Sequence, residues 1–288
     1  MDSQLIQLLV NGIAVGSVIA LASVGLTLTY GILRLANFAH GDLMTLGAYL
    51  TLLANASGVN IWISIAIGAV LTVGVALLTE KLLWSPMRDR RASTTTLIII
   101  SIGLALFLRN GIILLWGANN QSYRLPVASA LDIYGIRIAQ SRVIVVVLAI
   151  VVIFGLHYLL QNTKIGKAMR AVADNVDLAR VSGINVEYVV IWTWVIAAGL
   201  TAVGGGMYGL ITAVRPNMGW FLILPMFASV ILGGIGNPYG AIAGAFVIGI
   251  TQELSTYWLS PEYKLGVALL MMILVLLVRP QGLFRGTF

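Results

Sequence analysis

The sequence predicts an all-α protein that spans a membrane several times. Of its 288 residues, 59% are hydrophobic and only 9% are charged, whereas a soluble domain carries about 25% charged residues. The mean hydropathy is +0.99, and the apolar runs approach the ~20 residues that a helix needs to cross a bilayer. Because unpaired backbone groups cannot face lipid, these runs are predicted to be helices. We expect residues 1–288 to form a single transmembrane domain.

The composition also excludes several kinds of site. The chain has no cysteine, so it forms no disulfide or thiolate metal site. Its net charge of +7 comes from Lys and Arg in short loops between apolar runs, as the positive-inside rule predicts, and not from a face that binds nucleic acid. We therefore expect no nucleic-acid partner, no metal and no cofactor, and a lipid bilayer as the main surroundings.

Seven apolar runs have the length of a membrane span: residues 5–32, 36–56, 61–84, 93–116, 142–161, 189–213 and 264–278. An eighth stretch, 222–251, is interrupted by Gly233-Gly234-Ile235-Gly236-Asn237-Pro238. Its two arms are short for the ~30 Å of hydrocarbon, and irregular backbone at membrane depth must be buried in protein or line a cavity. The sequence thus predicts about eight membrane segments, one of them a broken or re-entrant hairpin.

The charges in the loops predict the orientation of these segments. Basic clusters within residues 81–91, 164–180 and 279–285 mark cytoplasmic positions. By counting spans from them, we expect a periplasmic N-terminus, a periplasmic loop at 117–141 and a cytoplasmic C-terminus. The count requires the stretch 222–251 either to re-enter from one side or to cross twice, and its short arms favour re-entry. Within the loop 117–141, the alternation from Leu131 to Ile138 fits a small β hairpin, and a solvated connector fits equally well.

The cytoplasmic segment 163–187 is patterned as one amphipathic helix. Apolar residues recur at helical spacing at positions 165, 168, 169, 172, 176 and 179, and Gly183 is a typical stop signal. A helix that lies on lipid headgroups is one interpretation. The mixed signs of Lys167, Arg170, Asp174 and Asp177 argue against an anionic lipid surface, and the small residues beside them permit close approach by another protein.

Four motifs, in order along the chain, resemble those of branched-chain amino acid ABC-transporter permeases. The first runs from Tyr30-Gly31 to Asn37-Phe38-Ala39-His40-Gly41-Asp42, and the second is Ile165-Gly166-Lys167-Ala168-Met169-Arg170-Ala171-Val172-Ala173-Asp174-Asn175. The third is Leu232-Gly233-Gly234-Ile235-Gly236-Asn237-Pro238-Tyr239-Gly240, and the fourth is Arg279-Pro280-Gln281-Gly282-Leu283-Phe284. The resemblance covers the chain from about residue 10 to its end, and within the family it is closest to permeases for small neutral amino acids.

The resemblance implies a role and a set of partners. Such permeases form the membrane pathway of an ATP-driven importer, together with a second, related permease subunit in a heterodimer, two cytoplasmic ATPase subunits and a periplasmic substrate-binding protein. The chain has no G-x-x-x-x-G-K-[ST] run, so it is expected not to be an enzyme. The residues expected to contact the ATPase are Gly166, Lys167, Ala168, Arg170, Ala171, Asp174, Asn175 and Gly183.

Two breaks in the apolar pattern supply candidate residues for the translocation pathway or its gate. They are Asn37, Phe38, His40, Gly41 and Asp42 in the first break, and Gly233, Gly234, Gly236, Asn237, Pro238 and Gly240 in the second. A turn at headgroup depth is the alternative interpretation of the first break. In the functional interpretation, His40 and Asp42 bind backbone groups at an inner gate. One His and one Asp are too few ligands for a metal.

The breaks also suggest how a zwitterion is held. Freed amides at helix N-termini suit a carboxylate, and unpaired carbonyls suit an ammonium group, so that the membrane interior requires no charge pair. Accordingly, Glu80 and Arg109 are expected at span ends, where long side chains reach water. The likeness of Asn37-Phe38-Ala39-His40-Gly41 to Asn237-Pro238-Tyr239-Gly240 hints at an internal repeat.

Three other functions compete with an ABC permease for neutral amino acids. A permease of the same family for urea or short amides has the same motifs. An ion-coupled secondary transporter needs carboxylates inside the membrane, and the candidates, Asp42 and Glu253, look interfacial. An intramembrane enzyme needs a nucleophile with a base, or clustered metal ligands, which two histidines and no cysteine do not supply.

Overall fold

The computed structural model describes residues 3–125, 130–133 and 136–284. The elements are α1 (Ser3–Leu33), α2 (His40–Ala56), α3 (Ile61–Thr79), a π-helical turn (Glu80–Trp84), α4 (Ser85–Asp89), α5 (Thr94–Trp116), β1 (Ala130–Ile133), β2 (Ile136–Ala139), α6 (Gln140–Asn162), α7 (Lys164–Asp174), α8 (Val176–Val181), α9 (Val186–Ile211), α10 (Met218–Gly233), α11 (Pro238–Ser255), a 3₁₀ turn (Pro261–Tyr263) and α12 (Lys264–Val278).

Six helices in the described ranges are long and apolar enough to cross a membrane. They are α1, α3 with its continuation to Asp89, α5, α6, α9 and α12 with the 3₁₀ turn before it, and each coincides with a predicted run. The helices of the two remaining predicted segments are not among the six: α2 has 17 residues, and the stretch 222–251 holds α10 with 16 and α11 with 18. The helical membrane fold is therefore confirmed, with three helices that differ from ordinary spans.

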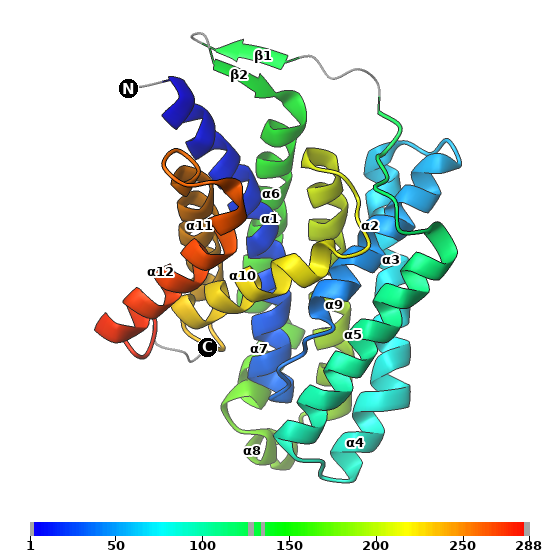
Figure 1. Ribbon diagram of the computed structural model, residues 1–288. Coiled ribbons are helices and arrows are strands. Elements are labelled where there is room, and N and C mark those ends of the chain that lie inside the picture. Colours follow the sequence, from blue (N-terminus) through cyan, green and yellow to red (C-terminus); the bar gives the residue numbers. More distant parts are fainter. Residues whose placement is uncertain (1–2, 126–129, 134–135, 285–288) are drawn as a thin grey trace.

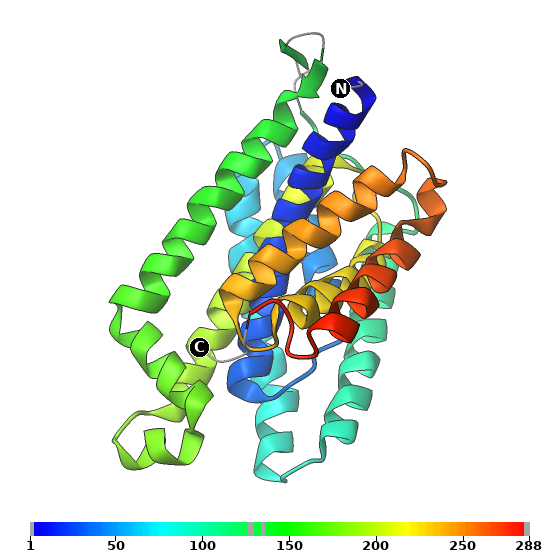
Figure 2. The same ribbon diagram turned by 90° about the vertical axis from the view of Figure 1, so that its left-hand side faces the viewer.

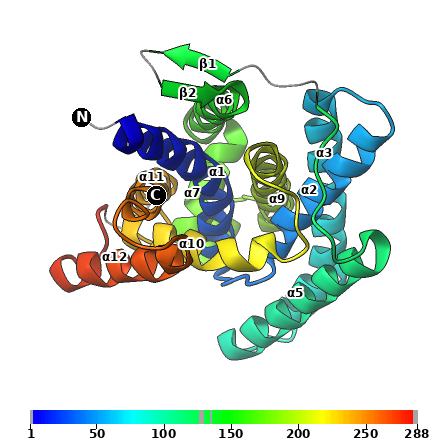
Figure 3. The same ribbon diagram turned by 45° about the horizontal axis from the view of Figure 1, so that its top comes forward.

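The long helices run between two ends of the molecule (Figures 1 and 2). We call the end with β1 and β2 the hairpin end, and the opposite end, with α4 and α8, the α8 end. Helix α1 runs from the hairpin end to the α8 end, and α9 runs the other way. Seen from the hairpin end, α1 and α9 are central while α5, α6 and α12 are peripheral (Figure 3), in agreement with the greater burial of α1 and α9.

Helices α2 and α10 begin inside the bundle instead of at its ends. After α1, residues 34–39 turn back, and α2 starts with His40 against the backbone of Ala22 in the middle of α1. After α9, residues 212–217 also turn back, and α10 starts against α2, where Gly219 N–H donates to Thr45 Oγ1 at 3.0 Å. The backbones of Gly41 and Gly219 are in direct contact, which only residues without a side chain permit.

The half-length helices α2 and α10 occupy equivalent positions in two parts of the chain, α1 to α5 and α9 to α12. The two parts have similar packing, and their helices run in opposite directions. Helix α1 packs against α11 as α9 packs against α3, and α2 packs against α3 and α5 as α10 packs against α11 and α12. This is the arrangement of an inverted repeat, which is common in transporters. The break that matches Asn37 is thus the one that holds Asn217, and not the turn at Asn237 that the sequence suggested.

The interruption in 222–251 is confirmed as a turn between α10 and α11. Both Gly234 (φ +104°) and Gly236 (φ +90°) adopt the left-handed region that favours glycine. Pro238 opens α11 at a position where the missing N–H costs nothing. Gly233 and Gly240 contact each other through their backbones, so α10 and α11 leave the turn as closely packed neighbours.

Two connecting segments complete the fold. The alternating stretch in 117–141 forms an antiparallel hairpin with Leu131 opposite Ile138, so the hairpin interpretation is confirmed. The prediction of a single helix in 163–187 is wrong, because α7 ends at Asp174 and α8 starts at Val176. Asn175 adopts an extended conformation and its Oδ1 accepts from Leu178 N at 3.0 Å, and this side-chain cap favours a new helix over continuation of the old one.

The contact between Gly41 and Gly219 predicts a steep cost for a single methyl group. We expect Gly41→Ala to lower the free energy of unfolding by about 1–3 kcal/mol, because the added Cβ collides with the carbonyl of Gly219. Thermal unfolding of the detergent-purified protein measures the change. Gly103→Ala in α5, where no atom lies within 4 Å of the added Cβ, is the matched control. Equal melting temperatures for the two variants would contradict the prediction.

Candidate translocation and coupling sites

The first break places its residues in the protein interior, at the crossing of α2 and α10. Asn37 is fully buried, and its Oδ1 accepts from Ala39 N at 3.0 Å. The Phe38 ring packs against Phe227 of α10, with centroids 4.9 Å apart, and Phe38 N–H donates to Ser101 Oγ of α5 at 3.2 Å. The break is therefore buried among helices, and its residues do not form an exposed turn.

His40 ties α2 to the two central helices. Its Nε2 lies 2.9 Å from the carbonyl oxygen of Ala22 in α1 and 2.7 Å from Thr201 Oγ1 in α9. A carbonyl oxygen only accepts, so Nε2 carries the proton. Nδ1 is buried without a partner. The expectation that His40 binds a backbone group is confirmed, and the contact anchors the start of α2.

Asp42 forms a buried ion pair, which the sequence interpretation had not predicted. Its two carboxylate oxygens accept from Nε and Nη2 of Arg109 in α5, both at 3.0 Å. The side chain of Asp42 is 1% exposed and that of Arg109 is 15% exposed. Arg109 also lies over the ring of Trp220 in α10, with Cζ 4.7 Å from its centroid. The two side chains are thus buried against each other, whereas Arg109 was expected to reach water.

Glu80 is a second buried carboxylate that was expected at a span end. It lies in the π-helical turn and is 6% exposed. Its carboxylate pairs with Arg88 of α4 and accepts from Trp194 Nε1 of α9 at 2.5 Å. The pair joins α3, α4 and α9 near the α8 end, so Glu80 holds helices together there instead of reaching water.

The second group of candidate residues lies elsewhere, at the α8 end. Gly236 N–H donates to Thr27 Oγ1 of α1 at 3.0 Å, and Asn237 Oδ1 accepts from the backbone N–H groups of Tyr239 and Gly240 at 3.0 and 3.1 Å. Tyr239 Oη in turn lies 2.8 Å from His157 Nδ1 of α6. The structure therefore brings the members of each group together but does not join the two groups.

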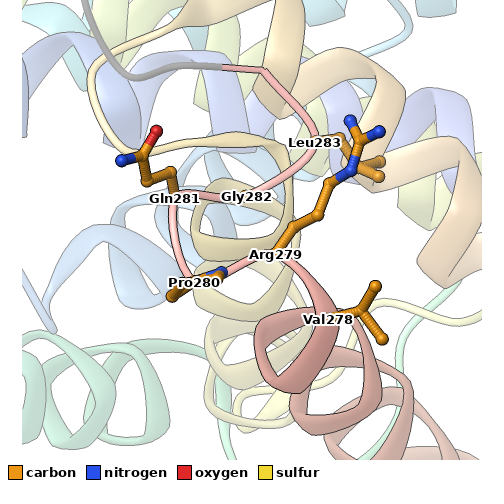
Figure 4. A pocket seen from close by; sticks show the side chains of 6 residues that line it. All are labelled: Val278, Arg279, Pro280, Gln281, Gly282 and Leu283. Carbon is orange, nitrogen blue, oxygen red and sulfur yellow. The ribbon is translucent and has the colours of Figure 1, made fainter.

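The C-terminal segment covers this turn. After α12 the chain reverses through residues 278–283, which line a shallow hollow beside α10 (Figure 4). Leu283 N–H donates to the carbonyl oxygen of Leu232 at 2.8 Å, and Phe284 N–H donates to that of Gly233 at 3.1 Å. These bonds satisfy carbonyls that the end of α10 leaves free. The motif that ends the chain thus packs on the motif of the hairpin turn.

The loop after α5 closes the opposite end of the crossing. Gln121 and Val214 exchange two backbone hydrogen bonds of 2.9 Å, which tie the loop to the segment that precedes α10. Tyr123 Oη donates to the carbonyl oxygen of Ala48 in α2 at 3.2 Å, and burial raises the pKa of the Tyr123 phenol. The loop therefore holds both half-length helices from the hairpin end.

The predicted coupling residues divide into a buried and an exposed set. Gly166 packs on the backbone of Leu159 and Leu160 at the end of α6, and Arg170 Nη1 donates to the carbonyl oxygen of Leu160 at 2.7 Å. Ala168 and Ala171 are half-buried in the same packing. The exposed members are Lys167, Asp174, Asn175 and Gly183. Gly166 and Arg170 thus fix the angle between α6 and α7, and the exposed residues remain available to a partner.

Helix α8 adds exposed residues that the sequence interpretation had placed in the apolar stripe or left out. Leu178 is 64% exposed and Val181 is 86% exposed, and Val176, assigned to the stripe, is also exposed. Asp177 and Arg180 are exposed beside them. Helix α8 lies at the α8 end of the molecule (Figure 1), so these exposed residues place apolar side chains among charges of both signs there.

Comparison with known proteins identifies the family. The family model described as "Branched-chain amino acid transport system / permease component" matches residues 8–276. The chain is 30% identical to the high-affinity branched-chain amino acid transport system permease protein LivH of Escherichia coli K12, over 96% of this chain and 94% of LivH. The chain belongs to this permease family. It is 30% identical to BraD of Pseudomonas aeruginosa over 96% of this chain and 95% of BraD.

A solved structure supports the fold over nearly the whole length. The protein described as PsaBC from Streptococcus pneumoniae in complex with Fab matches with a TM-score of 0.51 at 12% identity, over 98% of this chain and 94% of that chain. At this identity the match concerns the fold alone. With the family and the apolar helices, the chain is a multi-pass permease component of an ABC-type transport system in the inner membrane, and such components are membrane subunits rather than enzymes.

The buried ion pair predicts strong dependence of stability on Arg109. We expect Arg109→Leu to lower the free energy of unfolding by about 3–5 kcal/mol, because it leaves the Asp42 carboxylate buried without a counter-charge. The double variant Asp42→Asn with Arg109→Gln should lose less, since it leaves no charge uncompensated. Thermal unfolding in detergent measures both, with Arg124→Leu at the exposed hairpin end as control. A double variant less stable than Arg109→Leu would contradict this explanation.

Proposed function

We propose that this permease forms the pathway through which an ABC importer moves small neutral amino acids, including the branched-chain ones. The family match over residues 8–276 carries the proposal. The relatives matched over 96% of the chain are named as branched-chain amino acid permeases. By contrast, a fructose permease and a xylose permease match only 36% and 40% of the chain. Amino acids are therefore favoured over sugars as the substrate.

The pathway is assigned to the crossing of α2 and α10, with Asn37, Phe38, His40, Gly41 and Asp42 at its wall. In transporters with inverted repeats, the substrate site lies where the half-length helices of the two repeats meet. The turn of Gly233, Gly234, Gly236, Asn237, Pro238 and Gly240 is assigned to the gate at the α8 end. Its contacts with α1, α6 and the C-terminal segment allow it to respond to motion there.

The ATPase contact is assigned to α7 and α8, through Lys167, Asp174, Asn175 and Gly183. The exposed apolar side chains of Leu178 and Val181 support this assignment, because a patch of this kind is typical of an interaction surface. The α8 end is then cytoplasmic, as the basic loop residues predict, and the N-terminus and β1–β2 are periplasmic. In this orientation residues 212–217 together with α10 lead from the periplasmic to the cytoplasmic side, and α11 leads back, instead of forming a short re-entrant loop.

The remaining partners follow from the role. Two permease subunits, this one and a related one, enclose the pathway in a heterodimer, two ATPase subunits bind at the α8 end, and a periplasmic binding protein delivers substrate at the hairpin end. The large exposed side chains of α5, such as Phe107 at 75% and Leu114 at 85%, supply apolar surface for the second permease or for lipid.

Substrate competition tests the proposed cargo. In cells that depend on this importer, excess unlabelled leucine or alanine should reduce the initial uptake of labelled leucine by at least about 10-fold, because they compete for the same pathway. Urea and acetamide at the same concentration should leave uptake unchanged. Inhibition by urea alone would replace the proposed substrate by short amides. Uptake that continues after the ATPase subunits are deleted would favour an ion-coupled transporter.

A charge placed on α8 tests the ATPase contact. We expect Val181→Asp to reduce uptake by at least about 10-fold and to reduce recovery of the ATPase with the purified permease, because a carboxylate in an apolar contact loses its hydration. Leu125→Asp places the same charge on an exposed residue outside α8, where Leu125 is 40% exposed. This control should keep uptake and assembly. Equal uptake by the two variants would refute the assignment of α8.

A further inference from the structure

Arg109 is partly exposed at the surface of the chain, within the length of a membrane-spanning helix. It lies in α5 about two turns before the helix ends, and its side chain is 15% exposed. Trp220, which lies beneath its guanidinium, is 46% exposed. A cation exposed at this depth is costly against lipid, so such residues face protein or a water-filled cavity. The face that carries Arg109 and Trp220 is thus expected to line the pathway.

The guanidinium has hydrogen-bond donors to spare. Arginine has five N–H groups, and in this structure Nε and Nη2 each donate one to Asp42. The other three have no hydrogen-bond partner among the described residues. Two of them, one on Nη1 and one on Nη2, lie along the Nη1–Nη2 edge away from Asp42, and the third, on Nη1, points back toward Cδ. A guanidinium edge of this kind matches the two oxygens of a carboxylate.

Two backbone donors at the crossing already have partners, while the buried Asn37 Nδ2 has none in the described part of the chain. Ala39 N–H donates to Asn37 Oδ1 and Gly219 N–H donates to Thr45 Oγ1. The same holds for the turn at the α8 end, where Thr27 and Asn237 accept from the freed amides. The helix ends that the sequence suggested for a substrate carboxylate are thus partly occupied, whereas the outward edge of Arg109 is free.

We propose that the free edge of the Arg109 guanidinium binds the α-carboxylate of the substrate during passage, and that Asp42 makes this site select zwitterions over anions. The inference rests on the proposed function and names the residues that serve it. Asp42 already neutralises Arg109, so a net anion at the free edge adds an uncompensated charge in a medium of low dielectric constant. A zwitterion brings its own ammonium group and adds no net charge. Trp220 positions the guanidinium from below.

The test uses the purified complete transporter in lipid nanodiscs, without its periplasmic binding protein. The probes are leucine and 4-methylpentanoate, which has the same side-chain skeleton and carboxylate but no ammonium group. Binding is followed as the change in tryptophan fluorescence that the wild type shows and Trp220→Phe lacks. We expect leucine to bind at least about 10-fold more tightly than 4-methylpentanoate. Absence of any Trp220-dependent change with both probes would overturn the proposal.

Two substitutions separate selection from a structural role. In Asp42→Asn the preference should reverse in favour of 4-methylpentanoate, because Arg109 is then a charge without a counter-ion. An unchanged preference would overturn the role of Asp42. Arg109→Lys keeps the charge but loses the bidentate hydrogen-bonding edge of the guanidinium. It should weaken binding of both probes on the order of 10-fold. The control Arg124→Lys should leave binding unchanged. If Asp42→Asn does not fold, equal binding by these two lysine variants overturns the proposal.

Uptake into proteoliposomes with the binding protein present separates this inference from the proposed function. Leucine uptake without a Trp220-dependent signal overturns the Arg109 site and leaves the importer role in place. Absence of uptake for every neutral amino acid overturns the proposed function itself.

Discussion

The meeting of two helix starts inside the bundle is the constraint on which the rest of the structure depends. Helices α2 and α10 begin against each other at Gly41 and Gly219, whose backbones touch. Backbone groups freed at this depth have no water to bind and must find partners in the protein. Asn37 and Thr45 supply such partners, and His40 holds the start of α2 to α1 and α9. The two central helices are thus required to flank the crossing.

The Asp42–Arg109 pair extends this arrangement to the edge of the molecule. Helix α5 packs mainly on α2, and only a small part of it is buried. A bidentate ion pair inside an apolar bundle is strongly orienting, because separating its charges leaves each of them without solvent. The position of α5 relative to the crossing therefore depends on this ion pair in addition to the apolar packing of Leu104, Leu108 and Ile112. A helix held in this way keeps a free face for lipid or a second subunit.

The sequence predicted most of the fold, because long apolar runs and a Gly–Pro interruption are local signals. The turn at Gly233–Pro238 was predicted in place, and the hairpin near Leu131 and the break before His40 were each one of two interpretations. The partners of the buried charges were not predicted. Arg109 and Asp42 are 67 residues apart, and no local pattern indicates that they meet. The split of the coupling segment was missed because the cap at Asn175 outweighs an apolar periodicity that continues across it.

Contacts at the α8 end join α7 to the turn between α10 and α11, which we have proposed as the ATPase contact and the gate. Gly166 and Arg170 bind α7 to the last turn of α6, so α7 and the end of α6 move together. The same part of α6 carries His157, which contacts Tyr239 in the first turn of α11. Gly236, in the adjacent turn, binds α1 through Thr27. These contacts are polar and local, and each joins a different helix, so a displacement of α7 must either break them or move the turn between α10 and α11. That turn contains glycines in the left-handed region and is covered by the C-terminal segment, so the same displacement would also reach the end of the chain that the structure describes.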